Sequence, residues 1–98
     1  MKTFEDIKRI IEEHRKELIS RYKVKEIGIF GSYVRGEQDE TSDIDMLVDY
    51  SEEHISLFDV LDLKYYLEDL LGSKVDIVTR EALKPVIGRY IMDEVVFV

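Results

Sequence analysis

The sequence predicts a small α/β domain in which a mixed sheet of three to four strands carries helices packed on one face. Helix-like and strand-like patterns alternate along the chain in the order helix, strand, short helix, strand, helix, strand, helix, with a short tail. The 98 residues give room for a single domain over residues 1–98 with one core. A hydrophobic content of 45% is ordinary for a globular protein and excludes an intrinsically disordered chain.

The charges are distributed unevenly along the chain. The net charge of −8 argues against a protein that binds nucleic acid directly, because such proteins need a basic face. Residues 1–36 hold nine Lys and Arg against six Asp and Glu, whereas residues 37–98 hold five against sixteen. Two differently solvated faces would account for this asymmetry, and so would an acidic surface suited to a basic partner protein.

The composition also limits the compartment and the metal chemistry. There is no cysteine, which excludes disulfides and cysteine–zinc sites. No apolar run approaches membrane-spanning length, and no signal peptide precedes the first predicted helix. A cytoplasmic protein without a membrane partner is therefore expected.

The first predicted element is one helix that begins after Thr3 and ends near Arg21. Thr3 is a suitable N-cap, and apolar residues then recur at three- and four-residue steps. This stripe consists of Phe4, Ile7, Ile10, Ile11, His14 and Leu18. His14 lies at the edge of the stripe, so we expect a half-buried packing residue rather than a ligand.

A strand is predicted next, over residues 24–30. Ile27 and Ile29 fall on one of its faces. Gly28 and Phe30 fall on the other, since side chains alternate along a strand.

A glycine and a serine end this strand. Ser32 can cap a short helical turn over residues 33–36, and the polar residues 37–41 form a loop. A second strand is predicted over residues 44–48. The polar residues 51–54 then turn the chain.

A second long helix follows, with Ser56 as its cap and Gly72 as its C-terminal stop. Its inward-facing residues are Val60, Leu63, Leu67, Leu70 and Leu71. A third strand is predicted over residues 74–78.

The C-terminal part is predicted to contain a short helical segment and a short strand. The helical segment begins at Thr79 or at Lys84-Pro85, because proline suits a first helical turn. Residues 94–98 form the strand.

Two acidic residues stand one residue apart at the second predicted strand. Residues two apart on a strand point to the same side, so Asp43 and Asp45 project together. Neighbouring carboxylates on a sheet face repel each other and lose hydration, and a cation between them relieves this. The alternative is a solvated edge strand, but the apolar neighbours make this a core strand: Ile44, Met46, Leu47 and Val48.

A third carboxylate, Asp76, lies within the apolar run of the third predicted strand. Alone it would fit an edge residue. A charge in such a run needs a partner, and next to Asp43 and Asp45 it is expected to be a third metal ligand. Three oxygen ligands with open coordination positions suit Mg²⁺ or Mn²⁺, which keep waters and take substrate phosphates.

The Gly31-Ser32 turn offers a place for those phosphates. Glycine lets a phosphate approach the backbone, and Ser32 offers a hydroxyl beside the free amides of a helix start. Arg35, one turn later, adds positive charge for a triphosphate. A Gly-Ser pair alone is usually just a turn, so its meaning comes from its spacing to the acidic pair.

These residues together resemble a known signature. Gly31-Ser32, ten residues and Asp43-x-Asp45 resemble the polymerase beta-like nucleotidyltransferase superfamily. The words Gly-Ser-x-x-Arg-Gly and Ser-Asp-x-Asp, with the segment from Leu71 to Leu83, narrow this to the minimal nucleotidyltransferase (MNT) family. The resemblance covers nearly the whole chain and implies the small nucleotidyltransferase fold.

The resemblance also implies the chemistry of the site. It gives Asp43, Asp45 and Asp76 as catalytic residues that hold two divalent metal ions, with Asp43 and Asp45 bridging both. It implies ATP as the substrate, attacked at the α-phosphorus with release of pyrophosphate. The nucleotide-binding residues that it implies are Gly31, Ser32, Arg35 and Ser42.

MNT proteins resemble the antitoxin half of toxin–antitoxin pairs, whose partner is a helical HEPN ribonuclease. The implied activity is transfer of AMP to a tyrosine of that toxin within a hetero-oligomer. Larger relatives carry a second domain for the nucleobase and the acceptor, so here a partner protein is expected to complete the site. Two alternatives remain: an antitoxin that acts by binding alone, and nucleotidyl transfer to a small-molecule acceptor.

Overall fold

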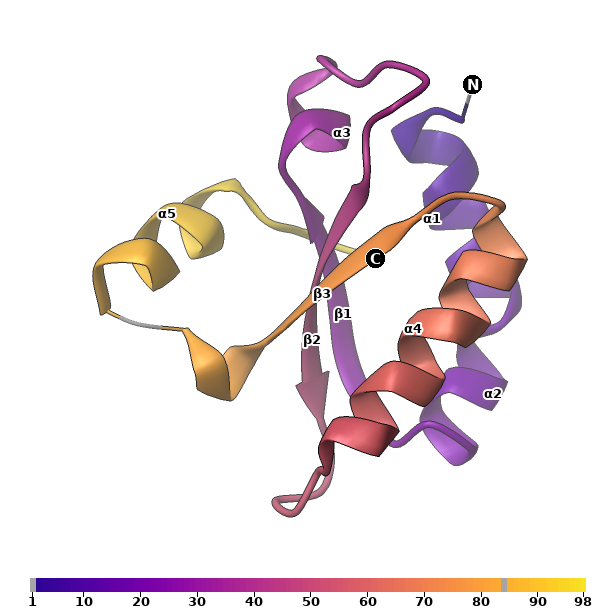
Figure 1. Cartoon of the computed structure of the whole chain (residues 1–98), viewed down its shortest axis with the longest axis vertical. Helices are drawn as coiled ribbons and strands as arrows, with labels where there is room; N and C mark the ends of the chain where they lie inside the picture. Colours follow the sequence, from indigo (N-terminus) through magenta and orange to yellow (C-terminus); the bar gives the residue numbers. More distant parts are fainter. Residues whose placement is uncertain (1, 84) are drawn as a thin grey trace.

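A four-stranded mixed sheet forms the centre of the molecule (Figure 1). The computed structural model describes residues 2–83 and 85–98. The strand order is β3-β2-β1-β4, in which β1 (Val24–Phe30) pairs antiparallel with β2 (Ile44–Tyr50) and with β4 (Val96–Phe97). β3 (Val75–Thr79) runs parallel to β2. The predicted mixed sheet is confirmed, and the C-terminal tail supplies its fourth strand.

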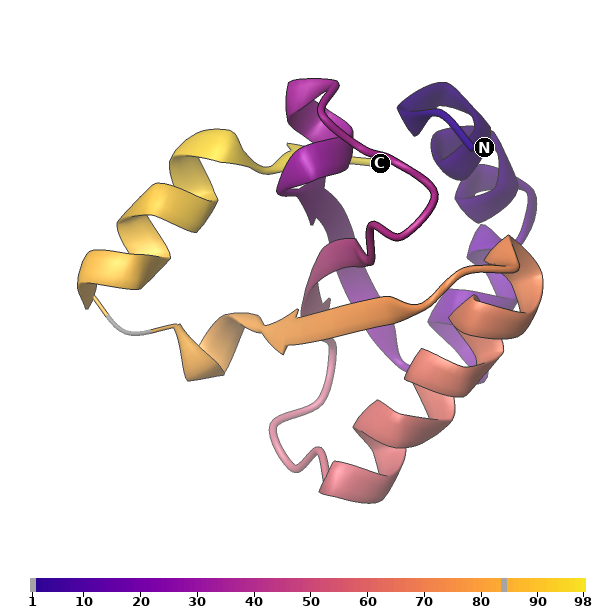
Figure 2. The ribbon, with the colours of Figure 1, turned by 45° about the horizontal axis from the view of Figure 1, so that its top comes forward.

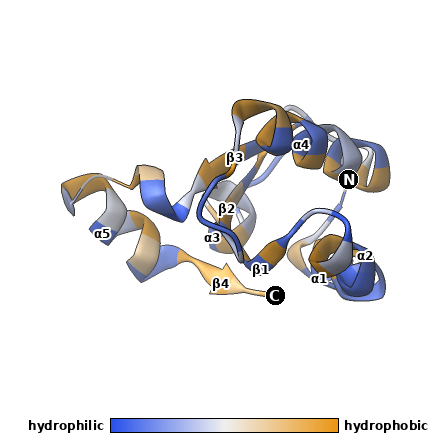
Figure 3. Ribbon diagram, turned by 90° about the horizontal axis from the view of Figure 1, so that it is seen from below, coloured by the Kyte–Doolittle hydropathy of each residue, from blue (hydrophilic) through white to orange (hydrophobic). Residues whose placement is uncertain are grey.

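Three helices cover one face of this sheet, as predicted, and one helix lies on the other side (Figure 3). The covering helices are α1 (Phe4–Glu13), α2 (Arg15–Ser20) and α4 (Leu57–Leu71). The remaining ones are the short α3 (Ser32–Arg35), the 3₁₀ turn η1 (Arg80–Ala82) and α5 (Pro85–Glu94), which lies on the opposite side from α4. None of the helices in the described part of the chain is long and apolar enough to span a membrane.

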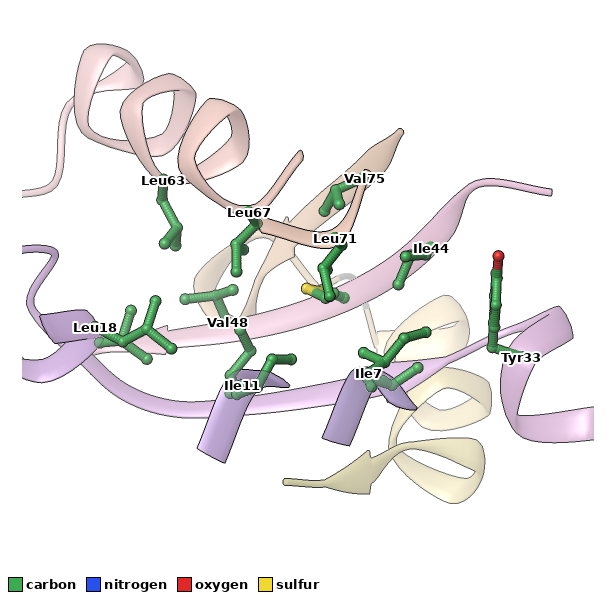
Figure 4. Close-up of a cluster of buried hydrophobic side chains, with 14 residues drawn as sticks. Ile7, Ile11, Leu18, Tyr33, Ile44, Val48, Leu63, Leu67, Leu71 and Val75 are labelled. Carbon is green, nitrogen blue, oxygen red and sulfur yellow. The ribbon is translucent and has the colours of Figure 1, made fainter. Parts of the chain in front are cut away.

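The core fills the space between the sheet and the three covering helices (Figure 4). Ile7, Ile11, Leu18, Leu63, Leu67 and Leu71 are fully buried against strand residues Ile27, Ile29, Ile44, Met46 and Val48. Each such side chain contributes roughly 1.5–3 kcal/mol when it is buried. Because strand side chains alternate, the residues between these core positions must face the other side of the sheet.

The ends of the long helices follow the sequence signals. Thr3 and Asp6 form a capping box, with the Asp6 amide donating to Thr3 Oγ1 at 3.2 Å and the Thr3 amide donating to Asp6 Oδ2 at 2.9 Å. Ser56 and Asp59 form the same box at the start of α4. Gly72 ends α4 with φ 64°, as a left-handed C-cap.

The single N-terminal helix predicted up to Arg21 is wrong, because the chain breaks at His14 into α1 and α2. The His14 ring donates from Nδ1 to the Ile10 carbonyl oxygen at 2.8 Å. An unbroken helix would use that carbonyl for the His14 amide, which instead donates to Ile11 O at 3.1 Å. The ring is half-buried and lies edge-on to Tyr66, in the packing role predicted for it.

Several element boundaries differ by one or two residues. Gly31, not Ser32, is the N-cap of α3, and Ser32 is the first helical residue. β2 continues to Tyr50 because its last residues pair with β1, and β3 begins at Val75 instead of residue 74. Both predicted helix starts are used: η1 follows Thr79 and α5 begins at Pro85, while Lys84 lies outside the described residues.

Candidate active site

The parallel register of β2 and β3 places two of the predicted carboxylates side by side. Asp45 is directly opposite Asp76 in this pairing, and Phe30 of β1 is its partner on the other side. The strand residues on either side of Asp45 are fully buried in the helix-covered core. Asp45 and Asp76 therefore project together from the sheet face opposite the three covering helices.

Asp43 joins this face from just before β2. The amide of the intervening Ile44 donates to Lys74 O at 2.9 Å, which fixes the start of β2 against the start of β3. Burial raises the pKa of Asp45 above its usual range, and the charges of Asp76 and Asp43 raise it further. The three carboxylates are thus close enough to repel one another.

Gly31 connects the phosphate turn to these carboxylates. Its φ of 80° and ψ of −151° belong to a region that is open essentially only to glycine. A Cβ placed on Gly31 would clash with Asp45 Oδ2 and would lie 3.1 Å from Asp45 Cγ. The absence of a side chain at Gly31 therefore makes room for the Asp45 carboxylate. The sequence predicted a glycine here for another reason, the close approach of a phosphate to the backbone.

Arg35, at the end of α3, faces the same region but is already paired. Its Nη1 donates to Glu94 Oε1 at 2.5 Å and its Nε donates to Glu37 Oε2 at 3.3 Å. These bonds, with that to Glu94 first, raise the pKa of the Arg35 guanidinium. Both Arg35 and Glu94 influence the pKa of Asp45, the arginine lowering it and the glutamate raising it.

Glu94 is the site residue that sequence reasoning missed. The sequence predicts Glu94 as the first residue of the C-terminal strand, but it is the last residue of α5, and the strand is limited to Val96–Phe97. Glu94 lies 59 positions after Arg35. Its position ends α5, and Figures 1 and 2 both show this end of α5 beside α3. No local pattern marks an acid whose partner comes from so distant an element.

The two serines have different surroundings. Ser32 opens α3 directly after Gly31 and is half-buried, at the place predicted for phosphate. The Ser42 hydroxyl accepts from the Asp39 amide at 2.9 Å and donates to Asp39 Oδ1 at 3.3 Å. Ser42 therefore orders the loop that leads into Asp43, and its contact with nucleotide stays a prediction.

The donor set suits a divalent metal ion in its chemistry. As the side chains of residues 2–83 and 85–98 are placed, no group of three His, Cys, Asp or Glu side chains is close enough together to hold a metal ion. Asp43, Asp45 and Asp76 nevertheless bring only carboxylate oxygens to one sheet face. Burial first, and then the charges of Asp76 and Asp43, raise the pKa of Asp45, and a divalent cation between the carboxylates would relieve that repulsion. Asp43 is half-buried and Asp76 is exposed, so a bound ion would still be open to water and to substrate on the Asp76 side.

Comparison with known proteins gives the family of this chain. The nucleotidyltransferase domain model matches residues 11–98. Protein adenylyltransferase MntA of Thermococcus cleftensis is 51% identical over 98 residues, which span all of this chain and 98% of that protein.

Solved structures share the fold. A protein described as a minimal nucleotidyltransferase matches with a TM-score of 0.75 and 35% identity, covering 92% of this chain and 93% of its own. A chain from the crystal structure of a toxin–antitoxin with AMP-PNP matches with a TM-score of 0.74 and 26% identity, covering 94% of this chain and 71% of its own. The protein therefore belongs to the nucleotidyltransferase domain family, among the MntA-like minimal nucleotidyltransferase antitoxins, which are protein adenylyltransferases.

Proposed function

We propose that this protein acts in the cytoplasm as an antitoxin, by transferring AMP from ATP to a tyrosine of a HEPN ribonuclease toxin. The observation that carries the proposal is the contact between Asp45 and Gly31, with Asp76 in register beside Asp45. It joins a carboxylate cluster to a phosphate turn, which are the two components that phosphoryl transfer needs. The identity of 51% to MntA supports protein adenylylation over other nucleotidyl transfers.

The nucleotide is ATP, with its triphosphate against the Gly31-Ser32 turn. α3 begins at Ser32, so its first backbone amides can donate to phosphate oxygens, and Ser32 adds a hydroxyl. Arg35 supplies the positive charge at the other end of this short helix. A structural relative of this chain comes from a toxin–antitoxin structure with AMP-PNP, an ATP analogue, which supports this choice.

Asp43, Asp45 and Asp76 would hold two Mg²⁺ ions, and Mn²⁺ has the same ligand preference. When bound, such ions neutralise phosphate charge and favour the ionised form of an attacking hydroxyl. Asp45 lies deepest, between Gly31 and Asp76, and fixes the cluster relative to the triphosphate. Asp76 is exposed and stands at the open side, where an acceptor hydroxyl can enter.

The reaction forms one bond to the α-phosphorus and breaks one, and the phenolic O–H bond also breaks, with its proton passing to water. The phenolic oxygen of the toxin tyrosine bonds to the α-phosphorus of ATP, the bond from that phosphorus to the β-phosphate oxygen breaks, and pyrophosphate leaves. The phenolic proton is released, which is the difficult part near neutral pH because a tyrosine has a pKa of about 10. The products are AMP-tyrosine and pyrophosphate.

The toxin must dock next to this cluster to present its tyrosine. Exposed apolar side chains of α5, together with Phe97 of β4, form a surface that we call the α5–β4 surface: Val86, Ile87, Tyr90 and Phe97. This surface borders the site, because Glu94, the last residue of α5, bonds to Arg35. The side chain of the next residue, Val95, fills the space above Gly28 of β1. The exposed apolar pair Leu57 and Phe58 lies instead on α4, which covers the other face of the sheet. The α5–β4 surface is therefore the one that can hold a toxin and also deliver its tyrosine.

An Asp43→Asn/Asp45→Asn double variant tests catalysis against binding alone. We expect it to bind the purified HEPN toxin as the wild type does, yet to transfer no label from α-phosphate-labelled ATP and to leave the ribonuclease active. Full neutralisation of the ribonuclease by this variant would favour a binding-only antitoxin. If a small-molecule acceptor became labelled while the toxin did not, the result would favour nucleotidyl transfer to a small molecule.

A further inference from the structure

Arg35 is held between two carboxylates that come from different parts of the chain. Glu37 is two residues away in sequence and bonds to Nε, while Glu94 lies on α5 and bonds to Nη1. The guanidinium side chain is still 48% exposed, so the pair stands at the surface of the site. The positive charge that the triphosphate needs is therefore already matched by two negative charges of the protein itself.

The two carboxylates differ in how firmly they are held. The Glu37 side chain is 64% exposed and belongs to the loop after α3, so it can swing into water. The Glu94 side chain is only 26% exposed. Its backbone is held by the adjoining Val95, whose amide donates to Ile91 O at 2.8 Å and whose side chain packs over Gly28. Glu94 is thus the partner that competes with an incoming phosphate.

We propose that Glu94 is a positioning residue, which holds Arg35 in the nucleotide-free protein and releases it to the triphosphate when ATP binds. The proposal rests on the proposed function only in taking Arg35 as a ligand of the triphosphate. The bonds to Glu94 and Glu37 use one Nη1 donor and the Nε donor of Arg35, so the competition with a phosphate is for the position and the charge of the guanidinium. A triphosphate carries more negative charge than one carboxylate, so it wins the exchange once it is bound next to Gly31 and Ser32.

When Arg35 moves from Glu94 to the triphosphate, α5 loses a bond that holds its C-terminal end. Gly88 is the only residue of α5 that the structure buries, so this helix has little packing of its own. The bond from Glu94 to Arg35 ties its end to α3, next to the pairing of β4 with β1. Loss of that bond loosens the end of α5 and with it the adjoining α5–β4 surface. Nucleotide binding and the position of the toxin-facing helix are coupled in this way.

The proposal predicts the sign of a substitution. Glu94→Gln removes the charge that competes for Arg35 and keeps the shape of the side chain. We expect the Kd for AMP-PNP with Mg²⁺, measured by calorimetry on the full chain, to fall about three- to fivefold, the range of a partly exposed ion pair. The KM for ATP should fall by a similar factor without a rise in kcat.

Two variants isolate the contact from general electrostatics. Asp93→Asn removes the same charge from the neighbouring residue of the same helix, which makes no recorded bond to Arg35 in the described part of the chain. It should change the Kd clearly less. In an Arg35→Ala background, Glu94→Gln should not change the Kd for AMP-PNP further, because the contact between Arg35 and Glu94 is already absent.

A structural readout accompanies the affinities. Amide hydrogen exchange over residues 91–97 should accelerate when the wild type binds AMP-PNP. In Glu94→Gln it should already be fast without nucleotide and should change little on binding.

Three outcomes would overturn the proposal. Weaker AMP-PNP binding by Glu94→Gln would mean that Glu94 orients Arg35 for the nucleotide and does not compete with it. An equal gain in the Arg35→Ala background would mean that the effect does not pass through Arg35. Failure of the wild type to bind AMP-PNP would remove this proposal and the proposed function together, whereas binding without AMP transfer to the toxin would contradict the proposed function alone.

Discussion

The carboxylate of Asp45 lies against the backbone of Gly31, in the space that a side chain at that position would fill. Gly31 directly follows β1 and Asp45 is near the start of β2, and these strands are antiparallel neighbours. The turn that precedes α3 and the acidic cluster are therefore one unit, and neither can shift without the other. The spacing between Gly31-Ser32 and Asp43-x-Asp45 has its physical basis in this contact.

A side chain at Gly31 should damage both the fold and the site. Gly31→Ala combines an unfavourable backbone conformation with a clash against Asp45, so we expect a loss of roughly 2–4 kcal/mol in the free energy of unfolding. Urea denaturation measures the loss, and AMP-PNP binding should weaken in the remaining folded protein. Gly36→Ala is the control for a positive φ alone: Gly36 has φ 71° and ψ 22°, in the left-handed region that other residues can enter at a cost, and nothing lies within 4 Å of the added Cβ. Its loss should be limited to about 1 kcal/mol. Equal losses for the two variants would show that the Asp45 contact carries no energy.

Divalent metal should stabilise the protein through Asp45. Adding Mg²⁺ at a hundredfold excess over its Kd should raise the free energy of unfolding by about 2.7 kcal/mol, because only the folded state assembles the cluster. The melting temperature of the wild type should rise accordingly, and Asp45→Asn should show no such rise. Asp62→Asn, which removes an exposed carboxylate from α4, should respond to Mg²⁺ as the wild type does. A rise of the same size in Asp45→Asn would place the bound metal elsewhere.

The cap of α4 should make stability depend on pH. The Ser56 amide and hydroxyl donate to Asp59 Oδ2 at 2.9 and 3.1 Å, and these bonds lower the pKa of Asp59 below its ordinary value of 3.8. Because the folded state favours the ionised form, this contribution is complete above pH 3.8 and is lost as the pH falls through the lower folded-state pKa. Asp59→Asn should therefore be less stable than the wild type at neutral pH, with a difference that shrinks below about pH 4 in urea titrations. A difference that is constant from neutral to acidic pH would mean that the charge of Asp59 is not involved.

The α5–β4 surface should be required for the toxin complex and not for folding. Tyr90 is 74% exposed, so Tyr90→Asp should leave the melting temperature nearly unchanged and should weaken binding of the purified HEPN toxin at least tenfold, as expected for an aromatic anchor. Phe58→Asp is the control, at 77% exposure on α4, and should bind the toxin normally. Calorimetry or size-exclusion chromatography of the mixed proteins measures both. Loss of the complex in the Phe58 variant alone would move the docking surface to α4.

Much of the fold could be predicted because its signals are local. The caps at Thr3 and Ser56, the stop at Gly72 and the alternation of Ile27 and Ile29 each depend on a few neighbouring residues. The break at His14 could not be predicted, because it depends on the ring bonding to Ile10 O, which a helical pattern does not encode.

The acidic part of the site could be predicted for a similar reason. Strand parity alone places Asp43 and Asp45 on one face, and only the pairing of Asp76 needed the parallel register of β2 and β3. Glu94 could not be found in this way, since its bond to Arg35 depends on how α5 returns to the sheet. The surface on α5 was also hidden, because apolar residues at helical spacing predict a buried face unless the partner element is known.

The most direct test of the account is the intact mass of the purified HEPN toxin after incubation with this protein, ATP and Mg²⁺. With the wild type, the toxin should gain mass in increments of AMP, and a toxin whose acceptor tyrosine is replaced by phenylalanine should gain none. With Asp76→Asn, the toxin should gain no mass although AMP-PNP still binds in part, because Asp43 and Asp45 remain. An unmodified toxin whose ribonuclease activity is nevertheless fully silenced by the wild type would contradict the central claim.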